Sequence, residues 1–193
     1  MNGKAVVEHA TILWRCLDVA GHDVAELRSS SDGAHLSGVT VRAYTDLPCR
    51  LEYTITCDAR WRTTRCLLTG HIGGAPLTLN VHHSAAGEWR VDGAVVANLA
   101  GCEDVDLGFS PATNLLPIRR LGLAVGQHAK VRAAWVRFPE LTVEVLEQEY
   151  TRVSSEHYQY QSAGGAFQRE LTVDPAGFII DYPGFWRAEK PTS

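Results

Sequence analysis

Hydrophobic and polar side chains alternate along most of this chain. The clearest run is residues 49–57, in which Leu51, Tyr53 and Ile55 alternate with charged and hydroxyl residues. Successive side chains of a β-strand point to opposite faces, so this run predicts a strand with one buried face. Eight further runs, most of them rich in β-branched or aromatic residues, predict strands at residues 36–44, 64–71, 77–83, 130–138, 141–153, 157–161, 167–173 and 177–182. With shorter runs added, we expect roughly ten or more strands.

Short glycine-containing turns separate these runs. They lie at residues 31–33, 73–74, 86–87, 92–93, 164–165 and 174–177. Connections this short place consecutive strands side by side and antiparallel. The pair Asp92-Gly93 joins residues 88–91 to residues 94–96, and it suits the two positive φ angles of a type I′ turn. We therefore predict a β-hairpin at this point.

Residues 110–123 are the one segment that resists assignment to a strand. Pro117 is tolerated in the first turn of a helix, and Gly122 can end one. Thr113 or Asn114 can cap its N-terminus. The sequence therefore predicts an all-β fold with one short central helix.

Two segments of the chain follow the same order of strand, turn, strand and acidic turn. They are residues 79–93 and residues 171–184. One interpretation is an internal duplication, with halves at about 1–100 and 125–193 joined by the helical segment. The other is that any two hairpins look alike, and the sequence leaves both open.

Composition and charge narrow the class of protein. The chain has 193 residues, of which 45% are hydrophobic and 21% charged, which excludes a disordered protein. A chain of this length forms one domain by default, so we expect a single domain over residues 1–193. Eighteen basic against twenty-two acidic residues give a net charge of −4, and the basic residues are scattered. That distribution excludes nucleic acid as a partner.

The cysteines and the N-terminal residues suggest a compartment. The five cysteines are odd in number and form no CxxC motif, which is typical of cytosolic thiols. The N-terminal residues show no apolar core of a signal peptide, and residues 4–10 fit either a short helix or an edge strand. No apolar run approaches the roughly 18 residues of a membrane span. We expect a cytoplasmic protein without a transmembrane segment.

A cluster of acidic residues faces a pair of arginines across the helical segment. Asp104 and Asp106 project from the same face of an extended strand, and Arg119 and Arg120 follow about a dozen residues later. A chain reversal would pair the guanidinium groups with the carboxylates as a structural network, which is the favoured interpretation. A polar binding site or an acid/base pair is the second, and a hard-cation site is the third.

Other candidate chemistry is sparser. His82 and His83 are adjacent, so a strand points them to opposite faces and they cannot share one metal ion. No nucleophile or phosphate-loop motif occurs, and we expect no metal or other cofactor. Aromatic residues lie near arginines, as at Trp61 and Arg65, and such surfaces suit the apolar face and hydroxyls of a sugar. The competing interpretation is that these rings fill a β core.

Residues 104–121 read DVDLGFSPATNLLPIRRL and resemble the signature of a bacterial family described as putative glycolipid-binding, in which DVDL precedes TN, one residue and LPIRRL. The resemblance continues over nearly the whole chain, at Tyr53, Cys57, Asp58, Trp61, Arg62, Arg65, Gly87, Trp89, Pro139, Gln148, Tyr150, Asp174, Gly177, Asp181, Tyr182 and Pro183. It departs at Ala112, where we expect a bulkier apolar residue. It implies one antiparallel sheet rolled into a spiral, open barrel-like shape, similar in outline to bacterial lipid carriers.

The leading hypothesis is a protein without enzymatic activity that binds a glycolipid or similar small amphiphile. An apolar groove would take the acyl chains, and an acid and arginine rim would meet the head group. The candidate ligand-binding residues are Asp104, Asp106, Thr113, Asn114, Arg119, Arg120, Trp61, Arg65 and Tyr150. The alternative is a small cytosolic hydrolase or isomerase that uses Asp104 or Asp106 as acid or base. A third hypothesis is an interaction module, and the oligomeric state is left open.

Overall fold

The computed structural model describes residues 8–45 and 47–189, and it is almost entirely β-sheet. The strands are β1 (Glu8–Cys16), β2 (Gly21–Ser30), β3 (Gly33–Tyr44), β4 (Leu47–Asp58), β5 (Thr63–Ile72), β6 (Ala75–His83), β7 (Trp89–Val91), β8 (Ala94–Val95), β9 (Asp104–Leu107), β10 (His128–Val136), β11 (Val143–Arg152), β12 (His157–Ser162), β13 (Phe167–Val173), β14 (Ile179–Tyr182) and β15 (Trp186–Ala188). The helix α1 spans Leu115–Leu121, and short 3-10 turns lie at η1 (Ala97–Leu99), η2 (Pro111–Asn114) and η3 (Ala163–Gly165).

All fifteen strands belong to one sheet. Its order is β8-β7-β6-β5-β4-β3-β2-β1-β15-β14-β13-β12-β11-β10-β9, so the first and last strands, β1 and β15, pair in the middle of the sheet. Every pairing is antiparallel except the last, in which β9 runs parallel to β10. The sheet is not closed, because β8 and β9 remain its two edges. The predicted all-β fold with an open, rolled antiparallel sheet and one short central helix is confirmed.

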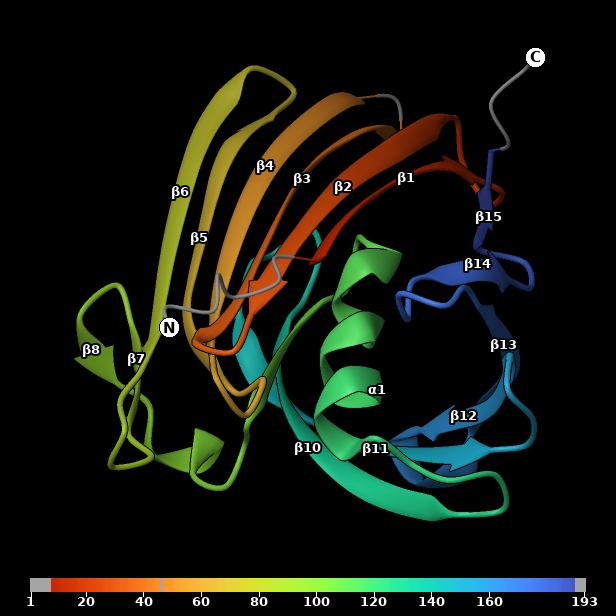
Figure 1. The fold of residues 1–193 in the computed structure, drawn as a ribbon. Helices are drawn as coiled ribbons and strands as arrows, with labels where there is room; N and C mark the ends of the chain where they lie inside the picture. The colour runs from red at the N-terminus through yellow and green to blue at the C-terminus, as the bar shows by residue number, and fades with distance from the viewer. Residues whose placement is uncertain (1–7, 46, 190–193) are drawn as a thin grey trace, which may run out of the picture.

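The sheet rolls up around its own β9 edge. Figure 1 shows α1 inside the roll, with β1 to β6 curving past one side and β10 to β13 past the other. We call β9 to β14 together with α1 the inner turn. The Thr63 amide on β5 donates to the Glu103 carbonyl next to β9, and the Val105 amide donates to Thr63 Oγ1. These hydrogen bonds attach β5 to β9 and so fix how β1 to β6 lie against the inner turn.

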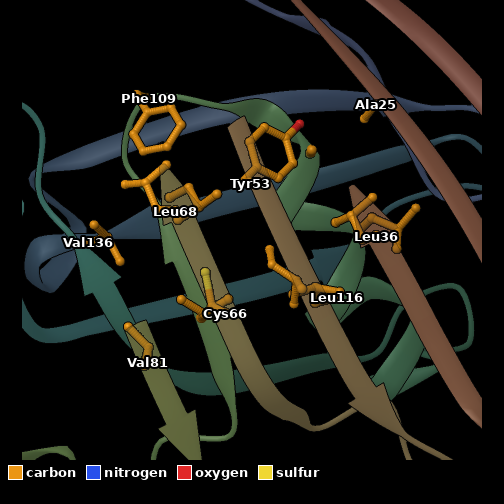
Figure 2. Packing of buried hydrophobic residues seen from close by; sticks show 14 of the residues in the cluster. Ala25, Leu36, Tyr53, Cys66, Leu68, Val81, Phe109, Leu116 and Val136 are labelled. Atoms are coloured by element: carbon orange, nitrogen blue, oxygen red, sulfur yellow. The ribbon is translucent and has the colours of Figure 1, made fainter. Parts of the chain in front are cut away.

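Strand β10 separates two hydrophobic cores. Its side chains alternate, so Ala134 and Val136 pack into the larger core with β1 to β6, whereas Val131 packs into a smaller core inside the inner turn. The connection that follows β9 also contributes to the larger core. Figure 2 shows Phe109 close to Tyr53, and Leu116 of α1 on the same side of the sheet, and the Tyr53 and Phe109 ring centroids are 6.3 Å apart. The larger core between the outer strands and the inner turn is therefore filled by side chains.

Local sequence explains most of these elements. The predicted strands at residues 36–44 and 49–57 lie within β3 and β4, and the other seven predicted runs each coincide with one observed strand. The hairpin between β7 and β8 is confirmed, and Asp92 and Gly93 have φ of 47° and 85°. Helix α1 ends at Gly122, which adopts the left-handed conformation with φ of 52°, as predicted.

Two details differ from the predictions, and one open alternative is decided in part. Strands β1 and β2 were not predicted, because the apolar residues Leu13 and Val24 are exposed on them whereas the polar residue Asp23 is buried. Residues 8–10 of the ambiguous N-terminal segment are strand, and the rest of that segment lies outside the described residues. Asn114 occupies the N-cap position of α1, as predicted for it or Thr113, but its side chain makes no capping hydrogen bond, and Thr113 Oγ1 accepts the Leu107 amide.

The internal duplication stays a prediction.

In the part of the chain that the structure describes, no helix is long and apolar enough to cross a membrane.

Candidate functional site

Strand β9 divides its four residues between the two cores. The parallel pairing with β10 sets Asp104 opposite Ala133 and Asp106 opposite Trp135, so both carboxylates point into the inner turn, as predicted. Val105 belongs to the larger core on the other face. The two aspartates share a face, yet their surroundings differ, and that difference decides what each can do.

Asp104 forms a closed ion pair with α1. Arg120 Nε donates to Asp104 Oδ1 at 3.0 Å and Arg120 Nη2 donates to Oδ2 at 2.6 Å, while Arg120 Nη1 lies 2.9 Å from Glu103. Burial raises the pKa of Asp104, and the hydrogen bonds from Arg120 oppose that rise. Asp104 is only 1% exposed. Both of its oxygens are occupied, so this pair holds α1 against β9 and offers nothing to a ligand.

Asp106 keeps one oxygen free. Gln148 Nε2 on β11 donates to Asp106 Oδ2 at 2.5 Å. No hydrogen bond from residues 8–45 or 47–189 reaches Oδ1, and this oxygen is not among the sealed, unpartnered atoms of the described chain. Burial raises the pKa of Asp106 to about 6, with the Gln148 hydrogen bond opposing the rise and the Asp104 charge adding to it. Asp106 is therefore mostly ionised at neutral pH and still able to accept a hydrogen bond.

Asp106 is also among the residues that line an apolar pocket of about 380 Å³. This pocket lies between the β9 end of the inner turn and β15, and we call it the inner pocket. Its polar lining residues are Asp106, Ser110, Asn114 and Ser162. Its aromatic lining residues are Trp135, Tyr160, Phe167, Tyr182, Phe185 and Trp186. Its volume lies in the lower part of the range of about 300–1,000 Å³ that is usual for small-molecule sites.

The aromatic wall is a connected cluster of rings. Tyr160 packs edge to face on Phe167 and Tyr182, with centroids 6.0 and 6.3 Å apart, and Tyr182 packs on Phe185 at 5.4 Å. Edge-to-face packing fixes ring positions, so the wall is preformed. Side-chain packing thus leaves rigid apolar faces around one carboxylate oxygen.

Buried hydrogen bonds hold the polar lining from behind. Asn114 Nδ2 donates to the Tyr150 hydroxyl at 2.8 Å, and Tyr150 is fully buried. Ser110 Oγ donates to the Tyr53 hydroxyl at 3.2 Å, and that hydroxyl donates to Asp23 Oδ1 at 2.8 Å. The polar positions of the inner pocket are therefore set by groups on β2, β4 and β11.

The structure separates the predicted site residues into groups. Asp106 and Asn114 line the inner pocket, and Tyr150 supports Asn114. Asp104 and Arg120 form the buried pair, so the predicted acid and arginine rim does not border this pocket. The reason is the short helix, which turns Arg120 back onto β9 and completes the pair inside the protein.

Four predicted residues lie away from the inner pocket. Arg119 pairs with Glu8 and lies over the Trp61 ring, 4.7 Å from its centroid. Trp61 borders a shallow surface hollow with Arg120 instead. Thr113 is buried, and Arg65 is exposed on β5. The structure therefore does not bring these side chains together into one ligand site.

Several lining residues were not predicted as part of a site. Trp135, Tyr160 and Tyr182 come from three strands that the sequence identifies as strands, but the spiral that brings them together is a long-range feature. A local signal did exist, because Tyr158, Tyr160 and Ser162 alternate with polar residues and mark one inward face. The alternation could not show that this face meets β9.

The cysteines belong to the cores. All five are buried free thiols. Burial raises the pKa of Cys57 and of Cys66 to about 12, so neither is a thiolate at neutral pH. Within residues 8–45 and 47–189, no group of three or more His, Cys, Asp and Glu side chains is placed to hold a metal ion.

Comparison with known proteins gives the family. A crystal structure of a DUF1089 family protein from Pseudomonas aeruginosa is similar at 31% identity and a TM-score of 0.73, over 97% of this chain and 94% of that one. The beta-barrel-like protein of domain of unknown function DUF1849 from Brucella abortus shares the fold, at 11% identity and a TM-score of 0.54, over 97% and 98% of the two chains. A search of curated proteins finds no match. The family model described as putative glycolipid-binding matches residues 11–188, and the chain belongs to that family.

Proposed function

We propose that this protein binds a small amphiphile of the glycolipid class in the inner pocket. The observation that supports the proposal is the combination of a preformed apolar pocket of about 380 Å³ with one free carboxylate oxygen and the hydroxyl and amide groups of Ser110, Ser162 and Asn114. Apolar walls with a few fixed polar groups are the usual design of small-molecule sites. The family to which the chain belongs carries the same suggestion in its description.

The volume of the inner pocket limits the size of the ligand that it can hold. A pocket at the lower end of the usual size range takes one chain segment with its attached polar group rather than a whole two-chain lipid. Burial of methylene groups contributes about 0.8 kcal/mol each, and binding costs offset much of this sum. An eight-carbon chain is therefore expected to bind with a dissociation constant on the order of 1 mM.

Blocking the pocket should remove binding. Leu146 lines the inner pocket, so Leu146→Trp fills it, and we expect the affinity for octyl glucoside to fall by about tenfold or more. Isothermal titration calorimetry below the critical micelle concentration measures this. Val125→Trp, at a residue that is 60% exposed, is the matched control and should leave the affinity unchanged.

Two results would count against the proposal. One is the absence of saturable binding of any single-chain amphiphile to the wild-type protein, together with no co-purified amphiphile in native mass spectra. The other is equal binding by the Leu146→Trp and wild-type proteins, which would place any site elsewhere.

The free carboxyl of Asp106 favours an enzyme as the second candidate. A pKa of about 6 suits a general acid or base near neutral pH, and the pocket would hold a sugar or lipid conjugate for hydrolysis or isomerisation. Asp104 cannot serve as its partner while Arg120 occupies both oxygens. We expect Asp106→Asn to abolish any turnover of nitrophenyl glycosides and esters, and no turnover by the wild-type protein would remove this candidate.

A further inference from the structure

The inner pocket contains an uncompensated negative charge. Asp106 is the only charged residue among those that line it. Its partner Gln148 is neutral, and Arg120, the cation associated with the neighbouring aspartate, donates to Asp104 and Glu103 instead. Asp106 is half-buried, and a carboxylate withdrawn from water without a cation is costly unless something brings a compensating charge. The geometry therefore favours a ligand group that is positively charged.

The walls of the pocket suit a cation. The faces of aromatic rings are negative, and a cation within about 6 Å of a ring centroid is attracted to them. Two rings of this cluster already contact a cation, since the Arg169 guanidinium lies 4.6 Å from the Phe167 centroid and 5.3 Å from the Phe185 centroid. Arg169 is held there by the Pro183 and Gln168 carbonyls and does not line the pocket.

We propose that the inner pocket binds the protonated amine of an amphiphile's head group, with Asp106 Oδ1 as the counter-ion and the rings of Trp135, Tyr160 and Tyr182 around it. This inference rests on the function proposed above and names its head-group class, which includes amino sugars. A neutral sugar would leave the charge uncompensated, and a sulfate or phosphate would add a second negative charge beside it.

The groups that face Asp106 from each packed element set its response to pH. They are Asp104 on β9, Trp135 on β10, Gln148 and Tyr150 on β11, Tyr160 on β12 and Tyr182 on β14, with Asn114 on η2. Burial raises the pKa of Tyr150, Tyr160 and Tyr182 above the usual value of a tyrosine, so these hydroxyls stay neutral. Asp106, with its pKa of about 6, is the group that titrates. An alkylammonium keeps its proton at these pH values, as a lysine does.

Three probes with the same chain separate the head-group classes. Octylammonium, octyl glucoside and octyl sulfate are titrated into the full chain by calorimetry below their critical micelle concentrations. At pH 7.5 we expect octylammonium to bind at least about tenfold more tightly than octyl glucoside and octyl sulfate to bind weakest. When the pH is lowered from 7 to 5, the affinity for octylammonium should fall about tenfold, because Asp106 takes up a proton.

Variants assign the preference to the carboxylate. Asp106→Asn should weaken octylammonium binding about tenfold or more, so that the preference for octylammonium over octyl glucoside is lost. Asp32→Asn, an equal change in charge at an exposed turn, should change neither. Equal or tighter binding of octyl glucoside, or no effect of Asp106→Asn on octylammonium, overturns this inference and leaves the proposed function standing. Failure of all three probes to bind defeats both.

Discussion

Arg120→Ala is expected to lower the free energy of unfolding by about 3–5 kcal/mol at neutral pH. The reason is the environment of its partner, because Asp104 is 1% exposed and receives two hydrogen bonds from this guanidinium. Removing the cation leaves a buried carboxylate unpaired, and that penalty exceeds the value of an ordinary surface pair. Urea denaturation at several pH values measures the loss. It should shrink at low pH, where Asp104 becomes protonated.

The control is an exposed pair of the same chemistry. Arg132 Nε lies 3.0 Å from Glu147, and the Glu147 side chain is 61% exposed, so Arg132→Ala should cost about 0–1 kcal/mol. Replacing both buried partners, as Arg120→Met with Asp104→Leu, should restore at least half of the loss because no charge remains unpaired. A cost below about 1 kcal/mol for Arg120→Ala would show that water reaches Asp104, contrary to the closed pair described here.

The sequence contains much of the fold because each strand repeats the same simple rule. Alternation along residues 49–57 identifies β4 and its buried face without any tertiary information. The same rule works poorly for β2, where the polar residue Asp23 is buried near the start of the strand, on the face that Ala25 and Leu27 share. Asp23 is buried because the Tyr53 hydroxyl on β4 donates to it, and such a contact cannot be inferred from neighbours in sequence.

The candidate site was less accessible to sequence reasoning. The shared face of Asp104 and Asp106 follows from strand geometry, and the pairing of Arg120 with Asp104 follows from a chain reversal through α1. The sequence pattern does not distinguish the role of Asp104 from that of Asp106. They differ because Gln148 holds Asp106 beside a pocket, whereas α1 closes over Asp104.

The parallel pairing of β9 with β10 fixes the positions of the two aspartates inside the inner turn. Short turns predicted antiparallel neighbours throughout, and this prediction fails only at β9, where η2 and α1 carry the chain across the roll before β10 begins. Parallel strands need a long crossover connection, and the helical segment is this crossover. The helix therefore does more than fill the interior, since it places β9 at the sheet edge and Asp106 beside the aromatic wall.

Asp23 links the larger core to the inner pocket. It is fully buried, and its Oδ2 and the nearby Arg42 Nε are the two sealed side-chain atoms without a partner in the described chain. Burial raises the pKa of Asp23 to about 7, with the hydrogen bonds of Tyr53, Ser110 and Thr40 and the Arg42 charge opposing the rise. Because Ser110 lines the inner pocket, the protonation of Asp23 and the position of a pocket hydroxyl are connected.

Asp23 should therefore make the folded state less stable as the pH rises. In the unfolded chain this carboxyl loses its proton near pH 3.8, whereas the folded protein keeps it to about pH 7, so the folded state binds more protons between these values. Stability falls through this window and levels off above it. Between pH 5 and pH 8, the free energy of unfolding of Asp23→Asn relative to wild type should rise by about 2–3 kcal/mol. Urea denaturation of both proteins at the two pH values measures it.

This comparison cancels the costs of the substitution that do not depend on pH, such as an unpartnered amide nitrogen. Tyr53→Phe removes a hydrogen bond that lowers the pKa of Asp23, so it should shift the pH window upward. Asp32→Asn, at an exposed turn, is the matched control, and its difference from wild type should change by less than about 0.5 kcal/mol. A difference between Asp23→Asn and wild type that stays constant from pH 5 to pH 8 would mean that Asp23 is ionised in the folded protein. Arg42 would then have to compensate the buried charge.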